Sequence, residues 1–245
     1  VKKFLAVDDI RYANVLIHDR HPEVRQAIAS RVQQEEYKQF IPRLLHDKSP
    51  LVRAELARQA SYGTYPTLIL DTLRNDKDAL VRLNVAKHGR DEDLDLFVTD
   101  KNPAIRAIVA LGRKDEHLDV LVNDPEPQVR VAVARVGRNK DLDILVNDDD
   151  DEVRATVVTH ARPQDITALH FDSSWLVQQA FAENLDVVED YRRIWFMTSD
   201  IPAIRRTAMR HADKSELSYL VDDTVQDISI YATLKYLAMQ DEDDE

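Results

Sequence analysis

The chain has 245 residues, of which 44% are hydrophobic and 32% charged, so it holds enough apolar side chains for a continuous core. It contains no cysteine, which excludes disulfides, zinc-thiolate sites, iron–sulfur clusters and cysteine nucleophiles, and a reducing cytoplasm is the expected compartment. The net charge of −12 does not favour a nucleic-acid partner, and no apolar run reaches the roughly 20 residues of a membrane helix.

A motif of an aliphatic residue followed by arginine recurs along the chain. Residues 8–18 are expected to form the second half of a truncated unit, and nine units then follow with spacings of 24 to 29 residues. Four consecutive spacings of 24 predict an internal repeat. In chain order, repeats one to nine are marked by Val24-Arg25, Val52-Arg53, Val81-Arg82, Ile105-Arg106, Val129-Arg130, Val153-Arg154, Val177-Gln178, Ile204-Arg205 and Ile228-Ser229.

Each repeat predicts two helices. Proline three residues before the arginine, in five repeats, marks the first turn of a helix of about three turns. Glycines at 89, 112 and 137 are expected to end three of these helices. A shorter element follows at 93–98, 117–122 and 141–146, with apolar spacing for one or two turns of α or 3-10 helix. Two helices in 24 residues leave no room for a strand.

The pattern Asp-x-x-Pro-x-Val-Arg-x-x-x-Ala, as in Asp124 to Ala134, resembles HEAT-type repeats. The 24-residue unit is similar to the leucine-rich repeat variant family, which pairs an α-helix with a 3-10 helix. The resemblance implies an all-α, right-handed α-solenoid of about nine short repeats, forming one domain over residues 1–240. Residues 241–245 are a run of acidic side chains and are expected to form a disordered tail. The type member of the variant family carries an iron–sulfur cluster, which a chain without cysteine cannot hold. No cofactor and no metal site are predicted.

An aspartate lies six residues before the arginine in most repeats. In HEAT-like repeats such columns form a ladder that ties adjacent units together, because aspartate can cap a helix start and accept a bidentate pair from arginine. We therefore interpret the columns as structural rather than as acid–base pairs. This Asp–Arg ladder comprises Asp47, Arg53, Asp76, Arg82, Asp100, Arg106, Asp124, Arg130, Asp148 and Arg154. An alanine column four residues after the arginine is expected where adjacent helices approach closely.

The first helices present a surface with few acidic residues. At 100° per residue, positions one, five and eight after the arginine face away from the core. The resemblance to HEAT repeats places this helix on the concave side, which predicts a partner-binding groove. The groove residues are Leu83, Lys87, Arg90, Leu111, Lys114, Val131, Arg135, Arg138, Arg162, Arg206 and Arg210. Complementing the helix dipole is the alternative role of the cations at position eight.

Three further clusters are interpreted as structural. The acidic run 148–152 lacks the spaced ligands and central glycine of an EF-hand, so we expect a solvated turn. His88, His160 and His211 share a column, but the first two lie three repeats apart, too far to share a metal. Aromatic residues at the stretched seventh repeat are expected to fill the core, with a ligand pocket as the alternative: Phe171, Trp175, Phe181, Tyr191, Trp195 and Phe196.

The sequence predicts a non-enzymatic protein–protein interaction scaffold that binds an extended or acidic partner segment. No nucleophile elbow, P-loop, zinc spacing or dinucleotide fingerprint is present. HEAT-like DNA glycosylases, or other nucleic-acid-binding proteins, and bilin-lyase-like chaperones are the alternatives. The glycosylases have a strongly basic concave face with catalytic aspartate and aromatic residues, whereas the basic strip here is thin.

Overall fold

The computed structural model describes residues 9–60, 66–160, 162–184 and 190–243. Within these ranges all regular secondary structure is helical, as predicted, and no strand occurs. No helix in the described ranges is long and apolar enough to cross a membrane. The chain divides into two compact units, Val1–Ala132 and Val133–Glu245. The single domain over residues 1–240 stays a prediction.

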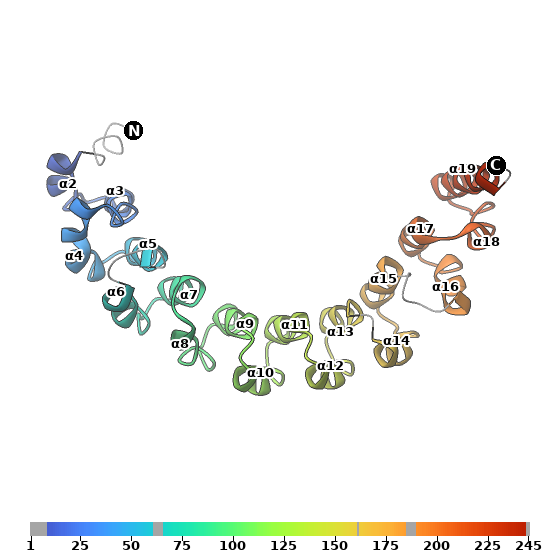
Figure 1. Ribbon diagram of the computed structural model, residues 1–245, viewed down its shortest axis with the longest axis horizontal. Coiled ribbons are helices and arrows are strands. Elements are labelled where there is room, and N and C mark those ends of the chain that lie inside the picture. Colours follow the sequence, from blue (N-terminus) through green and yellow to red (C-terminus); the bar gives the residue numbers. More distant parts are fainter. Residues whose placement is uncertain (1–8, 61–65, 161, 185–189, 244–245) are drawn as a thin grey trace. The chain divides into compact units, whose positions relative to one another are not determined.

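In the first unit, the helices alternate between two layers (Figure 1). The first helices of successive repeats pack on one another, α3 on α5, α5 on α7 and α7 on α9. The second helices form the other layer. The elements of this unit are α2 (Ile10–Leu16), α3 (Pro22–Ala29), the 3-10 helix η1 (Glu35–Phe40), α4 (Ile41–Leu45), α5 (Pro50–Gln59), α6 (Pro66–Leu73), α7 (Ala79–His88), α8 (Asp91–Leu94), α9 (Pro103–Leu111) and α10 (Asp115–Leu121).

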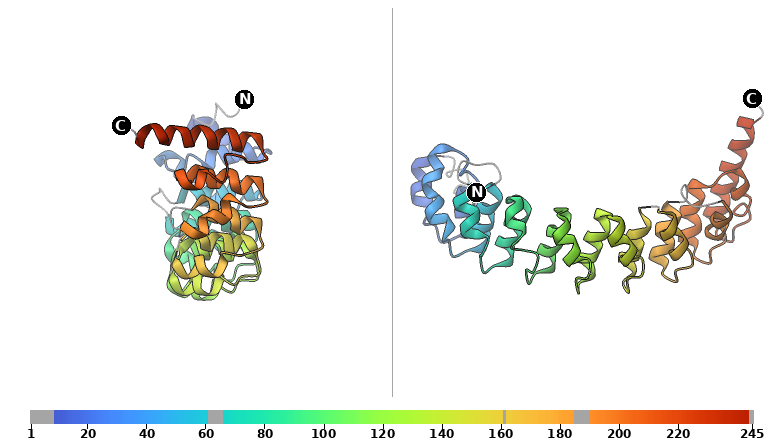
Figure 2. Two further views of the ribbon diagram at one scale, coloured as in Figure 1. Left: turned by 90° about the vertical axis from the view of Figure 1, so that its right-hand side faces the viewer. Right: turned by 60° about the horizontal axis from the view of Figure 1, so that its bottom comes forward.

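The second unit repeats this arrangement, and α11 (Pro127–Val136) contains the boundary between the units. Its first helices pack α13 on α15, α15 on α17 and α17 on α19. The elements are α12 (Asn139–Leu145), α13 (Asp151–Val158), α14 (Pro163–Leu169), α15 (Trp175–Glu183), α16 (Asp190–Met197), α17 (Pro202–His211), α18 (Lys214–Leu217) and α19 (Gln226–Asp243). Helix α19 has 18 residues and extends past α17 (Figure 2). It therefore includes residues 241–243, for which the sequence predicted a disordered tail.

Proline opens five of the first helices, as predicted, because its missing N–H would have no partner in the first turn anyway. The Asn102 side chain accepts the N–H of Ala104 at 2.9 Å and caps α9, whereas Ser49 makes no side-chain cap. The five prolines are Pro22, Pro50, Pro103, Pro127 and Pro202.

Three first helices end directly before a glycine, as predicted, at His88, Leu111 and Val136. Of these glycines only Gly137 takes a positive φ, at 78°, and in the fourth repeat Arg113 takes the left-handed conformation instead, with φ 62°. The second elements are short α-helices, and the described 3-10 helix is η1 in the first repeat.

The core lies between the two layers and is filled by the predicted columns. Val129 and Val133, one residue before and three after the arginine of the fifth repeat, are both fully buried. The alanine column is also buried, with no member more than 8% exposed, so neighbouring first helices can approach closely: Ala29, Ala57, Ala86, Ala110, Ala134 and Ala182.

Candidate functional site

Six arginines of the recurring aliphatic-Arg motif join adjacent repeats, because each binds the column aspartate of the next repeat. Arg106 donates from Nε and Nη2 to the two carboxylate oxygens of Asp124, in the next repeat, at 2.6 and 2.7 Å. Its Nη1 donates to the backbone carbonyl of Asp100, in its own repeat, at 2.7 Å. Equivalent bidentate pairs are Arg25–Asp47, Arg53–Asp76, Arg82–Asp100, Arg154–Asp172 and Arg205–Asp223.

Each ladder aspartate also accepts a backbone N–H two residues further on, as Asp124 does from Glu126 at 2.9 Å. This bond fixes the turn before the first helix rather than capping the helix itself. Arg130 donates to the backbone carbonyl of Asp124 at 2.8 Å. Asp47, Asp76, Asp100 and Asp124 thus accept from two arginines: the carboxylate from the arginine of the preceding repeat, and the carbonyl from the arginine of its own repeat.

These contacts hold the ladder carboxyls in their ionised form. Burial raises the pKa of Asp100, but the hydrogen bonds from Arg82 and from the Asn102 N–H outweigh it, and the net pKa lies below the usual 3.8. The hydrogen bonds from Arg205 are the largest cause of the lowered pKa of Asp223. A carboxylate stabilised in this way is a poor proton donor or acceptor near neutral pH.

The ladder is interrupted between the seventh and eighth repeats. Gln178 stands in the arginine column, and its Nε2 donates to the carbonyl of Asp172 at 3.1 Å. Ser199 stands in the aspartate column, and its Oγ accepts the N–H of Ile201 at 3.2 Å. Both charges of this link are replaced together, so neither a guanidinium nor a carboxylate is left buried without its partner.

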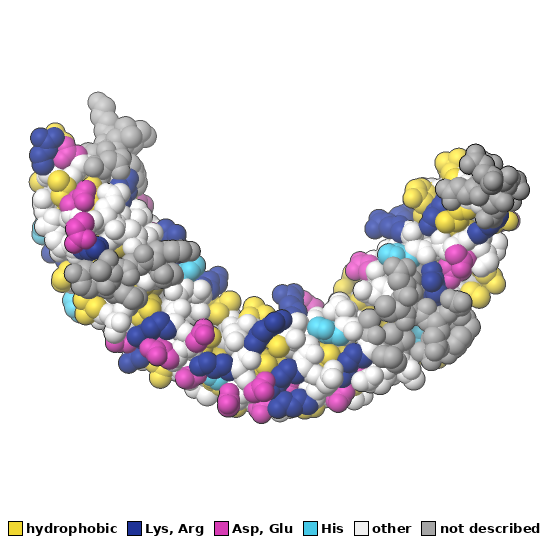
Figure 3. Space-filling view, viewed as in Figure 1, with side chains coloured by type: hydrophobic (Ala, Val, Ile, Leu, Met, Phe, Trp, Pro, Cys, Tyr) yellow, Lys and Arg dark blue, Asp and Glu magenta, His cyan; other side chains and the backbone are white. Residues whose placement is uncertain are grey.

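A second row of ion pairs engages the cations eight residues after the arginine column. Arg162 donates to both oxygens of Asp165 at 2.6 Å and forms an ion pair with Asp143 at 2.9 Å. Lys114 bonds Asp95 at 2.7 Å. Arg90 pairs with Asp93, Glu92 and Asp71, and Arg138 with Asp141. Figure 3 shows cations and acids interspersed over α8 and α10 of the first unit. Each of these four predicted groove cations precedes a second helix, and Arg90, Lys114 and Arg162 also bond an acid at the second helix of the preceding repeat.

The remaining predicted groove residues differ in exposure. Lys87 and Arg135 are exposed, and Leu111 is 47% exposed. Val131 was expected to face solvent but is only 4% exposed, because the wheel position one after the arginine lies between the first helices rather than outside them. Leu83 in that position is half-buried, Arg206 bonds Asp227 at 2.9 Å, and Arg210 is exposed.

Sequence reasoning missed an exposed aliphatic column in the second helices or directly after them. Leu96, Val120 and Ile144 are 50%, 56% and 50% exposed, and each lies four residues before a ladder aspartate. Their spacing of 24 residues was the signal that could have revealed them. The short second helices have too few turns to bury more than one side, so this aliphatic position stays in solvent.

The aromatic cluster of the second unit divides into two sets. Phe181 and Phe196 are buried and stack with ring centroids 5.8 Å apart, as the core prediction required. The core prediction was wrong for Phe171 and Trp175, which are 79% and 56% exposed. Trp195 is half-buried, and the side chain of residue 191 lies outside the described residues.

The acidic run is built into the start of α13. Asp150 accepts the N–H groups of Glu152 and Val153, and Asp151 accepts the hydroxyl of Ser174 in the next repeat at 2.7 Å. Across the described residues, no group of three or more His, Asp or Glu side chains is placed to hold a metal ion.

No family model matches the sequence, and no curated protein matches it. One solved structure, described as a leucine-rich repeat variant with a novel repetitive protein structural motif, is similar at 18% identity and a TM-score of 0.52. The match covers 77% of this chain and 87% of the other. The likeness shows the fold alone. This chain has a helical repeat fold. An engineered protein aligns over 93% of the chain at a TM-score of 0.19, which supports no argument.

Proposed function

We propose that the protein is a non-enzymatic interaction scaffold that holds an acidic segment of another protein on the exposed face of its first helices. The observation that supports this proposal is a set of exposed cations on the first helices that form no ion pair within the described residues. Lys87 in the first unit, and Arg135 and Arg210 in the second, are exposed and have no acidic partner among the residues that the structure describes. These three side chains we name the first-helix cations.

The surroundings of the first-helix cations favour a protein partner. Leu111 occupies the same position of the fourth repeat as Lys87 does of the third, and its aliphatic side chain is half exposed. Exposed apolar groups supply affinity and cations supply steering and orientation, which is how protein interfaces divide these roles. A repeat scaffold offers such surfaces over several repeats.

The bonding of the acidic side chains supports the non-enzymatic part of the proposal. The ladder aspartates are the most regular acidic column, and those bonded to arginine are saturated by a guanidinium and a backbone N–H. General acid–base catalysis needs a carboxyl group that can gain and lose its proton near neutral pH. The lowered pKa of Asp100 and of Asp223 runs against that requirement.

The test is photo-crosslinking in a native lysate. A benzophenone amino acid is placed at Leu111 or Arg210 on the first helices, or at Leu96 or Ile144 on the second helices, and the adducts are identified by mass spectrometry. We expect one protein species to be captured from the first-helix positions and to be absent from the second-helix positions. Capture only from Leu96 and Ile144 would instead assign the function to the aliphatic column of the second helices.

Charge reversal gives an independent readout with the captured protein. Lys87→Glu combined with Arg135→Glu should abolish capture while the circular dichroism spectrum and melting curve stay close to wild type. Arg11→Glu with Lys140→Glu is the matched control, because both side chains are exposed and neither belongs to the first-helix cations. Asp95→Lys or Asp143→Lys would be a poor control, since Asp95 bonds Lys114 and Asp143 bonds Arg162.

A further inference from the structure

A row of exposed cations follows the turns between the repeats of the first unit. In each of its first four repeats, a lysine or arginine comes directly after the ladder aspartate, and every one of these side chains is exposed. Arg43, in helix α4 before the turn that leads into the second repeat, is also exposed and lines the same depression as Arg20 and Lys48. We name this row the basic edge; it consists of Arg20, Arg43, Lys48, Lys77 and Lys101.

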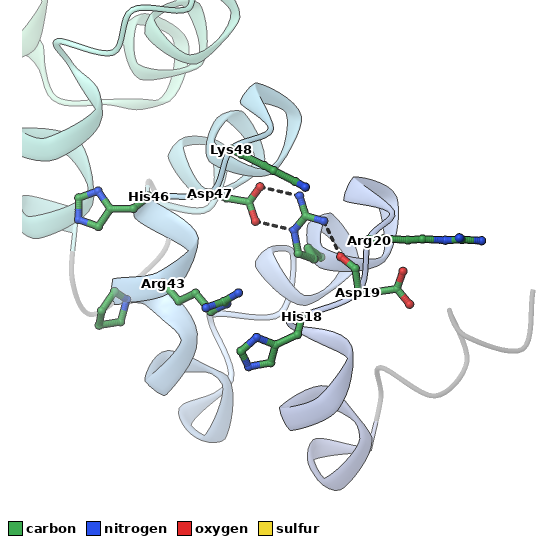
Figure 4. Close-up of a pocket in the computed structure, with 9 residues that line it drawn as sticks. His18, Asp19, Arg20, Arg43, His46, Asp47 and Lys48 are labelled. Carbon is green, nitrogen blue, oxygen red and sulfur yellow. Dashed lines mark hydrogen bonds and ion pairs between the residues drawn. The ribbon is translucent and has the colours of Figure 1, made fainter.

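The basic edge is continuous over four repeats. A depression of about 790 Å³ is lined by Arg20, Arg43 and Lys48 (Figure 4). The next depression, of about 570 Å³, is lined by Lys48 and Lys77, and a third, of about 500 Å³, by Lys77 and Lys101. Because neighbouring depressions share a lysine, a single ligand segment can contact all of them in turn.

The acids that line these depressions are already engaged. The Arg25 guanidinium donates to the carboxylate of Asp47 and to the carbonyl of Asp19, the two aspartates labelled in Figure 4. Asp76 and Asp100 are held in the same way by the arginines of the second and third repeats. By contrast, no acid among the described residues is bonded to the three lysines of the basic edge. The positive charge of this edge is therefore available to a ligand.

The turn itself does not require a cation at this position. The corresponding residues of later repeats are Pro125, Asp149, Ser173 and Thr224, and the same turn forms around them. The first unit holds 21 Lys and Arg and 21 Asp and Glu, whereas the second holds 12 and 24. The whole net charge of −12 thus lies in the second unit, and the cations of the basic edge lie in a neutral one.

We propose that the basic edge binds an extended acidic segment of another protein, with a carboxylate at about every third residue. Helices of adjacent repeats pack about 8–10 Å apart. An extended chain advances about 3.3 Å per residue, so every third side chain meets the next cation and about nine residues cover the edge. The basic edge shares no residue with the first-helix cations, so this proposal goes beyond the proposed function and does not depend on it.

A protein segment fits the basic edge better than single-stranded nucleic acid does. Nucleic-acid grooves combine cations with exposed aromatic side chains on which bases stack. Phe97 is the only Phe, Tyr or Trp that lines the three depressions among the described residues, and it is 2% exposed. The lining therefore offers charge for carboxylates and no platform for bases.

Fluorescence anisotropy tests the proposal with three labelled probes. The first is a peptide of about twelve residues with glutamate at every third position and Gly or Ser between, long enough to span the edge. The second peptide has lysine in place of glutamate, and the third probe is a thymidine oligonucleotide of the same length. The edge variant is Lys48→Glu/Lys77→Glu/Lys101→Glu. The control variant, Arg11→Glu/Arg113→Glu/Lys140→Glu, changes the net charge by the same amount at exposed positions that belong neither to the basic edge nor to the first-helix cations.

We expect the wild type and the control variant to bind the glutamate peptide equally, and the edge variant to bind it about tenfold more weakly or worse, because three attractive pairs become repulsive. The lysine peptide should not bind to the wild type. Circular dichroism establishes that all three proteins are folded. Equal loss in both variants, or no binding of the glutamate peptide by the wild type, overturns the proposal. If the wild type binds the oligonucleotide more tightly than the glutamate peptide, and the edge variant loses this binding, the proposed ligand is wrong and the basic edge binds nucleic acid instead.

Discussion

Replacing Arg106 by alanine tests whether the Asp–Arg ladder holds adjacent repeats together. The change removes three hydrogen bonds, two to Asp124 and one to the carbonyl of Asp100. It leaves the Asp124 carboxylate, which is 5% exposed, with only the Glu126 N–H as a donor. Breaking a buried ion pair from one side costs about 3–5 kcal/mol, because the remaining charge stays buried. We therefore expect Arg106→Ala to lower the free energy of unfolding by about that amount.

The assay is a double-mutant cycle in urea, followed by circular dichroism. Asp124→Ala should cost a similar amount, and the double variant less than the sum, with a coupling of about 1–3 kcal/mol. Because each repeat contacts only its neighbours, amide hydrogen exchange should lose protection first in α9, α10 and α11. Arg206→Ala is the control, since Arg206 and Asp227 are 41% and 63% exposed. An Arg106→Ala effect no larger than that of the control would refute a structural role for the ladder.

Three further predictions follow from other contacts. The pKa of Asp100 and of Asp223 is lowered in the folded state, so the stabilisation that these two groups contribute is present above the unfolded pKa of 3.8 and is lost as pH falls below it; the melting temperature should therefore drop steeply below about pH 4. A constant melting temperature down to pH 2.5 would contradict this. Gly137→Ala should destabilise by about 1–3 kcal/mol, because φ is 78° and a Cβ would lie 2.4 Å from the His160 ring, whereas Gly112→Ala, at φ −68°, should cost less in the same urea titration. Arg162→Ala should reduce hydrogen-exchange protection in α12 and α14, and protection equal to wild type would show that the second row of ion pairs is dispensable.

Most of the fold could be predicted from the sequence because its signals are local and recur. Proline at a helix start, glycine at a helix end and alanine where helices approach each act within one repeat, and the 24-residue spacing repeats them. Val129 and Val133 were placed correctly in the core by helical periodicity alone. The end of α19 was not predicted, since a run of acidic residues favours disorder by composition but does not prevent a helix from continuing to Asp243.

The candidate surfaces were harder to predict because pairing between repeats is not visible along the chain. Arg90 and Arg162 were expected to be open to a partner, but their carboxylate partners come from the second helices of two repeats. Val131 was misplaced because a helix wheel shows one helix and not its neighbours. The basic edge was overlooked because each of its lysines looks like an ordinary turn residue, and only the shared depressions bring them into one row.

The interrupted link between the seventh and eighth repeats has a consequence for mechanical load. At the joint of α15 and α17, Gln178 and Ser199 replace the charged pair that clamps other joints, and the Gln179–Thr207 hydrogen bond at 2.9 Å remains. If the second unit is stretched from its ends in an optical trap, this joint should open at a lower force than the clamped joint of α13 and α15. Introducing Gln178→Arg together with Ser199→Asp should raise the rupture force and move the first opening event elsewhere. Under load we therefore expect the second unit to lengthen first by separation of α15 from α17, while the repeats on either side of this joint stay folded.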